Sequence, residues 1–241
     1  MKILGHRGYK TEGKPYQNTY EAISLALQEG ADGVELDILT NAQGICYLSH
    51  DDEIEIHSDL DNGKISELTK EEIATKRVGF NGEYFQISKL EPILKLFKND
   101  YSEKLLNIEI KQEGITGLIA KEIEQSGIDK TQIIISCFEH SELEAYRKID
   151  KDIKLGILFE GDKPKSYIQY VNELAKKLAP TSIHPDIESN IFDVFIDAEK
   201  YFWTVKEGQL DKLEGIKNLN IIVDSIPKIK KVIKTRLETK K

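Results

Sequence analysis

The residues of this chain that could do chemistry together are acidic and basic side chains in or just after apolar runs. In the run Val-Glu-Leu-Asp-Ile, Glu35 and Asp37 alternate with aliphatic residues. As a strand, this run places both carboxylates on one face, where they repel each other unless a cation or a proton lies between them. The run Ile-Glu-Ile-Lys repeats the pattern with Glu109 and Lys111. Each pattern alone is more typical of a half-solvated sheet edge than of a metal site, so the surrounding residues decide the interpretation.

Three further polar residues follow apolar runs, namely His6, Arg7 and His50. The three carboxylates have no cysteine among them, and such an oxygen-rich set suits Mg²⁺ or Ca²⁺ better than Zn²⁺. The two histidines are then left for proton transfer, because imidazole titrates near neutral pH. Arg7 and Lys111 carry positive charge beyond what a metal site needs, which indicates an anionic substrate such as a phosphate.

Each of these residues also has an ordinary structural interpretation. His6 could be a core histidine, Arg7 could form a salt bridge with Glu35, and Lys111 could neutralise Glu109. Seven such residues together nevertheless favour a site, because buried charges are unfavourable unless they are paired or coordinated.

The segments that position these residues alternate between strand-like and helical patterns. Apolar runs alternating with helical segments of about 10 to 15 residues predict a parallel sheet, and their number favours an α/β fold, a (β/α)8 TIM barrel, over an open doubly wound sheet. In such a barrel the reactive residues gather at the carboxyl ends of the strands. The sequence contains nine strand-like runs, whereas a (β/α)8 barrel has eight strands. We expect the additional strand, which would lie outside the barrel, within residues 33–50. The segment after Ile38 could form either a hairpin or an extended stretch that leads to His50. Beyond this region the sequence predicts helices over 69–75, 89–97, 117–125, 141–148, 166–178, near Phe192, over 210–217 and from Pro227.

Composition limits the possible classes of protein. With 241 residues and 39% hydrophobic residues, the chain suits a single barrel domain over residues 1–241, with a short polar loop insertion over 51–89. The net charge of −8 argues against a general nucleic-acid surface. Cys46 and Cys137 lie in apolar runs and are expected to be small buried hydrophobic residues.

The apolar runs and the first and last residues of the sequence indicate whether the protein associates with a membrane and in which compartment it is expected. No run reaches the about 18 apolar residues of a membrane-spanning helix, and the first residues do not form a signal peptide, so we expect a cytoplasmic protein without integral membrane association. The segment from Lys228 to Lys241 holds seven basic residues. A membrane-surface helix is one interpretation, but the solvated face of a last barrel helix is favoured, because Ile226, Ile229, Val232 and Ile233 form an apolar stripe.

The order of these motifs resembles that of the glycerophosphodiester phosphodiesterases, which belong to the barrels similar to phosphatidylinositol phospholipase C. The resemblance runs from residue 3 to about residue 230. The matching pieces are Gly5-His6-Arg7-Gly8, Gln17-Asn18-Thr19, the segment Gly30 to Asp37, His50-Asp51, Asn107 to Lys111, Ser136-Cys137-Phe138, Trp203-Thr204-Val205 and Val223 to Pro227.

The resemblance implies a barrel enzyme that uses one divalent cation, Mg²⁺ or Ca²⁺, to hydrolyse glycerophosphodiesters to glycerol 3-phosphate and an alcohol. It also implies a role for each matching residue, as follows: His6 and His50 as the acid and base, Glu35, Asp37 and Glu109 as metal ligands, Arg7 and Lys111 as phosphate contacts, and Trp203 as a wall of the substrate pocket.

Two departures from the family pattern bear on specificity. The chain has Gln17 where the family usually has Glu, and it has an acidic segment after Asp51 where the family usually has an Arg-Thr-Thr-like run. Two alternative functions therefore stay open at this stage. One is hydrolysis of lipid phosphodiesters in the manner of a lysophospholipase D, and the other is binding of a phosphoryl ligand with little catalysis. The leaving alcohol, the choice of cation, a cyclic phosphate intermediate and the oligomeric state are not predicted.

Overall fold

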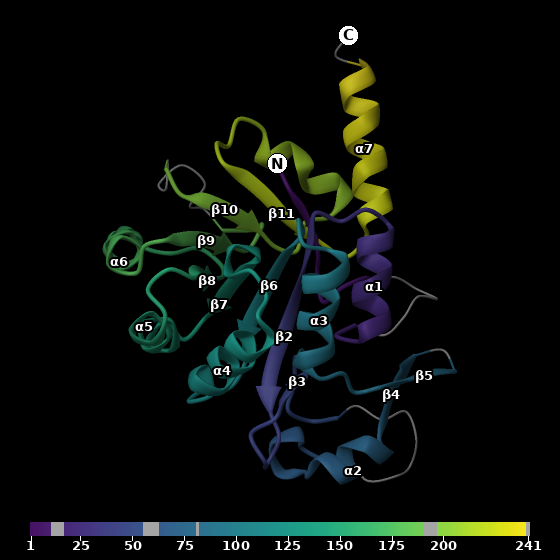
Figure 1. Ribbon diagram of the computed structural model, residues 1–241. Helices are drawn as coiled ribbons and strands as arrows, with labels where there is room; N and C mark the ends of the chain where they lie inside the picture. Colours follow the sequence, from purple (N-terminus) through teal and green to yellow (C-terminus); the bar gives the residue numbers. More distant parts are fainter. Residues whose placement is uncertain (11–16, 55–62, 81, 190–196, 240–241) are drawn as a thin grey trace.

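The computed structural model describes residues 1–10, 17–54, 63–80, 82–189 and 197–239. Its centre is a closed barrel of parallel strands, in which neighbours follow the order β1-β11-β10-β9-β8-β7-β6-β2 and β2 pairs with β1 to close the ring (Figure 1). The barrel strands are β1 (Ile3–Gly5), β2 (Gly33–Thr40), β6 (Leu105–Ile110), β7 (Ile133–Cys137), β8 (Lys154–Phe159), β9 (Thr181–Pro185), β10 (Glu199–Phe202) and β11 (Leu219–Val223). The predicted TIM barrel is confirmed.

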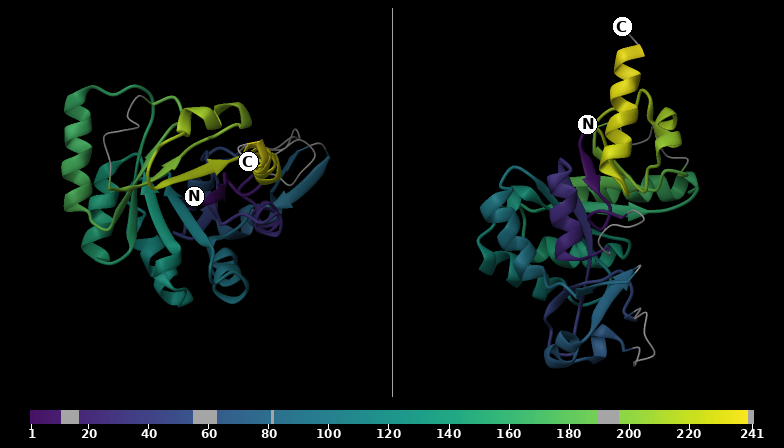
Figure 2. Two further views of the ribbon diagram at one scale, coloured as in Figure 1. Left: turned by 90° about the horizontal axis from the view of Figure 1, so that it is seen from above. Right: turned by 90° about the vertical axis from the view of Figure 1, so that its right-hand side faces the viewer.

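Helices cover the outside of the barrel, as Figure 2 shows. They are α1 (Tyr20–Gln28), α3 (Leu90–Asp100), α4 (Thr116–Ser126), α5 (His140–Ile149), α6 (Lys165–Lys177) and α7 (Ile226–Thr239). Local sequence signals explain the ends of α1. The Thr19 hydroxyl accepts a hydrogen bond from Ala22 N at 3.1 Å, which caps the first turn. Gly30, with φ of +83°, takes the left-handed conformation after the last turn.

One predicted helix is wrong in type and position. The connection between β10 and β11 carries a 3-10 helix, η3 (Glu207–Leu213), in place of an α-helix over 210–217. Leu210 and Leu213 are buried three residues apart, which matches the period of the 3-10 helix. Gly215 then adopts a positive φ of +85° and prevents further extension. The predicted helical piece near Phe192 lies outside the described residues.

The irregular strand within residues 33–50 forms a hairpin with β2. Strand β3 (Cys46–Leu48) is antiparallel to β2, with Ile38 opposite Leu48 and Thr40 opposite Cys46. Asn41 makes the turn, because its side-chain oxygen accepts hydrogen bonds from the backbone N–H groups of residues 43 and 45 at 3.1 and 2.9 Å. The prediction that one strand lies outside the eight-strand ring is therefore confirmed.

The segment 51–89 contains the helix predicted over 69–75, which is confirmed, and it has more structure than the predicted loop. Its described parts form η1 (Ile65–Glu67), α2 (Lys70–Thr75) and an antiparallel pair of strands, β4 (Arg77–Phe80) and β5 (Glu83–Gln86). A small apolar core holds them against the hairpin and consists of Leu39, Tyr47, Ile54, Ile65, Ile73 and Ile87. Figure 1 places this insertion beside the end of β2, which is the carboxyl end of the barrel.

The last helix and the cysteines follow the sequence predictions. Ile226 and Ile229 of α7 are buried, and Val232 and Ile233 pack against the core, so this helix belongs to the barrel wall. Cys46 and Cys137 are buried free thiols. Among the described helices, none combines the length and the apolar character that crossing a bilayer requires.

Candidate active site

The three carboxylates predicted from the sequence meet inside the barrel near its carboxyl end. Glu35 and Asp37 lie on β2, and Glu109 lies on the neighbouring β6 in register with Asp37. Their exposed fractions are 3%, 1% and 7%, and one ligand oxygen of each lies within 4.8 Å of the others. The alternative of a half-solvated sheet edge is wrong, because both faces of a barrel strand are covered.

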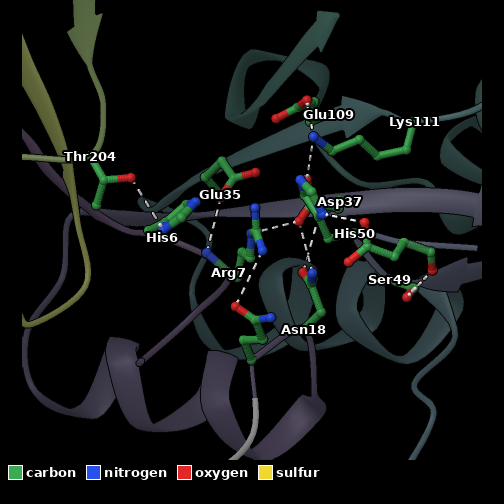
Figure 3. Close-up of polar contacts among 12 residues, drawn as sticks. His6, Arg7, Asn18, Glu35, Asp37, Ser49, His50, Glu109, Lys111 and Thr204 are labelled. Atoms are coloured by element: carbon green, nitrogen blue, oxygen red, sulfur yellow. Dashed lines mark hydrogen bonds and ion pairs between the residues drawn. The ribbon is translucent and has the colours of Figure 1, made fainter. Parts of the chain in front are cut away.

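Positive groups surround Asp37. Arg7 Nε lies 3.0 Å from Asp37 Oδ2, and Lys111 Nζ lies 3.3 Å from Asp37 Oδ1 and 2.5 Å from Glu109 Oε1. Asn18 Nδ2 donates a hydrogen bond of 2.8 Å to Asp37 Oδ2, and its side-chain oxygen accepts one from Asp37 N (Figure 3). Asn18 had no predicted role, although it lies in a matching motif.

The turn after β1 aims both His6 and Arg7 into the site. Arg7 has φ of +53°, and its backbone N–H donates a 2.9 Å hydrogen bond to Glu35 Oε2. Gly8 follows with φ of +87°, and a Cβ there would lie 2.7 Å from the backbone of helix α1, so only glycine fits. Gln17 Oε1 accepts a hydrogen bond of 3.3 Å from Arg7 Nη1, so Gln17 holds this loop without the charge of the usual Glu.

The electrostatics of the three carboxyl groups differ. Burial, with the charges of Asp37 and Glu109, raises the pKa of Glu35 well above its usual value. Burial and Asp37 likewise raise the pKa of Glu109 to about 7, although Lys111 opposes this. Burial acts in the same direction on Asp37, but Lys111, Arg7 and the Asn18 hydrogen bond outweigh it and lower the Asp37 pKa. The raised pKa values of Glu35 and Glu109 show that the three carboxylates repel one another when all are ionised, even with Arg7 and Lys111 beside Asp37.

This donor set fits a hard divalent cation. Glu35 Oε1 is buried and has no hydrogen-bond partner among the described residues. A buried carboxylate oxygen without a donor is unfavourable, and a cation ligated by oxygens of Glu35, Asp37 and Glu109 would remove that cost. Carboxylate oxygens are the ligands that Mg²⁺ and Ca²⁺ prefer. The buried acidic cluster could therefore hold a metal ion.

Each histidine of the site has an aspartate on its Nδ1 atom. His6 Nδ1 lies 2.8 Å from Asp224 Oδ1, and Thr204 Oγ1 lies 3.4 Å from the same nitrogen. His50 Nδ1 lies 2.9 Å from Asp51 Oδ1. An ionised carboxylate only accepts hydrogen bonds, so each Nδ1 carries a hydrogen and Nε2 is the ring nitrogen available to exchange a proton. Asp224 lies in a motif noted in the sequence, but no role was predicted for it.

A cavity of about 150 Å³ joins these groups to the opposite wall of the barrel. It is lined by His6, Arg7, Glu35, His50, Asn107, Glu109, Lys111, Phe138, Leu158, Glu160, Trp203 and Ile222. All the residues predicted for the site are thus brought together, with Asp37 paired to Arg7 and Lys111. Phe138 and Glu160, like Asn107, line the cavity without having been predicted to.

Comparison with known proteins gives the family. The model of the Glycerophosphoryl diester phosphodiesterase family matches residues 6–225. The chain belongs to this family. It is therefore a phosphoric diester hydrolase with the TIM barrel of the glycerophosphodiester phosphodiesterases.

Several relatives of this family are similar over most of the chain. A glycerophosphodiester phosphodiesterase of Bacillus altitudinis is 28% identical over 198 residues, which are 78% of this chain and 76% of that protein. The crystal structure of a putative glycerophosphoryl diester phosphodiesterase from Silicibacter pomeroyi has a TM-score of 0.83 at 15% identity and covers 98% and 93% of the two chains. An Oleispira antarctica phosphodiesterase, whose structure contains the product sn-glycerol-3-phosphate, has a TM-score of 0.75 at 19% identity over 97% of each chain.

Proposed function

We propose that this protein hydrolyses glycerophosphodiesters to glycerol 3-phosphate and an alcohol, with one divalent cation and two histidines that transfer protons. The observation that carries the proposal is the buried cluster of Glu35, Asp37 and Glu109, with His6 and His50 on the same cavity. The family assignment and the product bound to the Oleispira antarctica enzyme support the substrate class.

The metal site consists of Glu35, Asp37 and Glu109. A bound Mg²⁺ or Ca²⁺ would draw electron density from a phosphate oxygen and offset the clustered negative charge. Arg7 and Lys111 line the same cavity, and both already contact Asp37. We assign them to the phosphate, since a guanidinium fork and an ammonium together stabilise the charge that develops on its oxygens.

His6 is the base in this proposal. Burial lowers the pKa of His6, while the hydrogen bond that His6 Nδ1–H donates to Asp224 acts in the opposite direction, so the imidazole is held neutral and ready to accept a proton. Asp224 fixes the ring so that Nε2 receives the proton from the attacking hydroxyl group. Asp224 then stabilises the imidazolium that forms.

His50 is the acid that protonates the departing alkoxide. His50 lies just after β3, on the side of the cavity next to the insertion formed by residues 51–89. It also lines a neighbouring pocket of about 30 Å³ together with Asp51 and Glu53. Asp51 accepts the hydrogen bond from Nδ1–H, and in the imidazolium form of His50 the second proton, on Nε2, passes to the leaving oxygen, which leaves the ring neutral. A positioned acid of this kind contributes roughly 10²- to 10⁴-fold in rate.

The variant His50→Ala tests this assignment. We expect its kcat on a glycerophosphodiester to fall by roughly 10²- to 10⁴-fold, while its affinity for Mg²⁺, measured by calorimetry, stays at the wild-type value. Full activity of His50→Ala would contradict the assignment. His140→Ala is a matched control, because His140 interacts with Tyr170 and the Leu158 carbonyl and does not line the cavity.

A further inference from the structure

Asn107 is a buried polar side chain in the active-site cavity that the proposed mechanism does not use. Its exposed fraction is 1%, yet within the described residues its amide makes no hydrogen bond, and its side-chain oxygen is buried without a donor. Buried side-chain amides are nearly always hydrogen-bonded, because burial of a polar group without a partner costs free energy. A bound ligand would remove this cost.

The barrel places Asn107 directly beside the carboxylate cluster. Asn107 on β6 is the register partner of Glu35 on β2, and it lies two residues before Glu109 on the same strand. Residues two apart on a strand point to the same face, so Asn107 and Glu109 both point into the barrel. Asn107, Glu35 and Glu109 all line the active-site cavity. Since a strand rises about 3.3 Å per residue, Asn107 lies one layer below Glu109, farther from the mouth of the barrel.

Glu35 Oε1 is a second buried oxygen without a donor in this layer. Glu35 Oε2 accepts a hydrogen bond of 2.9 Å from the backbone N–H of Arg7, whereas none of the described residues donates to Oε1. The amide of Asn107 does not donate to it either. Two neighbouring acceptor oxygens that both lack a donor are the arrangement that a cation requires, because a cation satisfies both at once.

Asn18, the other asparagine beside the cluster, shows what a structural amide looks like here. Its Nδ2 donates to Asp37 Oδ2 at 2.8 Å, and its oxygen accepts a hydrogen bond of 3.1 Å from Asp37 N. Asn107 makes neither kind of contact with the described residues. A substrate group is also a poor partner for Asn107, because substrate enters from the carboxyl end of the barrel and the layer of Asp37 and Glu109 lies in between.

We propose that the side-chain oxygen of Asn107 is a fourth ligand of the divalent cation, beside the carboxylates of Glu35, Asp37 and Glu109. An amide oxygen adds a ligand without adding negative charge to three carboxylates that already repel one another. Four protein oxygens favour Ca²⁺, which takes roughly six to eight oxygen ligands including asparagine carbonyls, over Mg²⁺, which usually keeps several waters. This inference rests on the proposed function, which places the cation in this cluster.

The test measures cation binding without turnover. Calorimetry at pH 8 gives the affinities of the wild-type protein and of Asn107→Ala for Ca²⁺ and for Mg²⁺. We expect Asn107→Ala to lower the Ca²⁺ affinity by about 10- to 100-fold and the Mg²⁺ affinity by less. Luminescence decay of Tb³⁺ bound in place of Ca²⁺, compared in H₂O and D₂O, counts the water molecules on the ion. Asn107→Ala should hold about one water more than the wild-type protein, because water takes the vacated ligand position.

Asn107→Asp is the second variant. It keeps the size of the side chain and an oxygen that can bind the cation, so it should retain at least the wild-type affinity for Ca²⁺ and the wild-type number of waters on Tb³⁺.

Asn220→Ala is the matched control for a structural role. Asn220 is likewise a buried asparagine of a barrel strand, its oxygen accepts a 2.8 Å hydrogen bond from Lys2 N, and it does not line the cavity. This variant should lower Tm and leave the affinity for Ca²⁺ unchanged.

Three results would overturn the inference. The first is an Asn107→Ala variant that binds Ca²⁺ as tightly as the wild-type protein, which would mean that water alone occupies the amide. The second is a loss of affinity without an additional water on Tb³⁺, which would make Asn107 a positioning residue for Glu35. The third is a loss of Ca²⁺ affinity in Asn107→Asp. A wild-type protein that binds no divalent cation would instead refute the proposed function together with this inference, so the two failures are distinguishable.

Discussion

His6 Nδ1 lies 2.8 Å from Asp224 Oδ1, although the two residues are 218 positions apart in the chain. Pairing of β1 with β11 brings them together, because Gly5 and Val223, the residues before them, are register partners. The first and last strands of the barrel thus meet at a proton-transfer group and the carboxylate that orients it.

Asp224→Asn should impair the chemical step without affecting the metal site. Asparagine can turn its amide N–H₂ toward His6 Nδ1, which would place the imidazole hydrogen on Nε2 and block the base. We expect kcat to fall by roughly 10²- to 10⁴-fold. Asp224 raises the pKa of His6 through its hydrogen bond and charge. The acidic limb of the residual pH–rate profile should therefore move to lower pH.

Measurement of kcat and of its pH profile for Asp224→Asn checks this, with Asp162→Asn as the control, because Asp162 is exposed and does not line the cavity. A profile that keeps the wild-type limb, or a kcat equal to that of the control, would mean that Asp224 does not act through His6.

Affinity for the divalent cation should depend on pH near neutrality. In the metal-free protein the pKa of Glu109 is raised to about 7, and that of Glu35 is raised well above its usual value. Below pH 7 protons occupy these carboxyl groups and the cation must displace them, so affinity should fall by about tenfold per pH unit for each proton displaced. Calorimetry of Mg²⁺ or Ca²⁺ binding in buffers of different ionisation enthalpy should detect proton release at pH 7. An affinity that is constant from pH 5 to pH 8, with no proton release, would contradict this electrostatic description.

Two substitutions in the carboxylate cluster should have opposite effects on metal-free stability. Burial and the neighbouring carboxylates raise the pKa of Glu35, so the folded state at pH 7 must hold this group either ionised among other negative charges or protonated, and both cost free energy relative to the unfolded chain. We expect the neutral Glu35→Gln side chain to remove that cost and to raise the Tm of the metal-free protein. Asp37 has a lowered pKa and pairs with Arg7 and Lys111. Asp37→Asn should therefore destabilise it by about 1–3 kcal/mol.

Thermal unfolding of both variants at pH 7, with a chelator and with Mg²⁺, provides the measurement. Both variants should lose most of the stabilisation that Mg²⁺ gives to the wild-type protein. Equal destabilisation by the two substitutions without metal would disprove the distinction between Glu35 and Asp37.

Both the barrel fold and the clustering of the carboxylates could be predicted from the sequence, because both follow from local alternation of residue types along the chain. Alternation of Glu35 and Asp37 with aliphatic residues is a local property of a strand, and apolar runs separated by helical segments are typical of parallel barrels. The alternation could not distinguish a solvated face from a barrel interior, because this depends on closure of β2 onto β1 and β6.

The residues that orient the site were not predicted, because their partners are distant in sequence. Asn18 holds Asp37 from 19 positions away, and Asp224 holds His6 from the other end of the barrel. Both lie in motifs that the resemblance had marked, but only the fold assigns their contacts. The 3-10 helix η1 and the strand pair β4–β5 within 51–89 were not predicted for a related reason, since Ile65 and Val78 pack in a small core with residues of the β2–β3 hairpin.

The central claim is that this barrel hydrolyses glycerophosphodiesters through its buried carboxylate cluster. Its most direct test is product analysis on a panel of glycerophosphodiesters, with the same protein assayed in Mg²⁺ or Ca²⁺ and after removal of metal by a chelator. We predict that glycerol 3-phosphate and the free alcohol form with the cation, disappear with the chelator and return when the cation is restored. Turnover that is unaffected by complete removal of the metal would contradict the account.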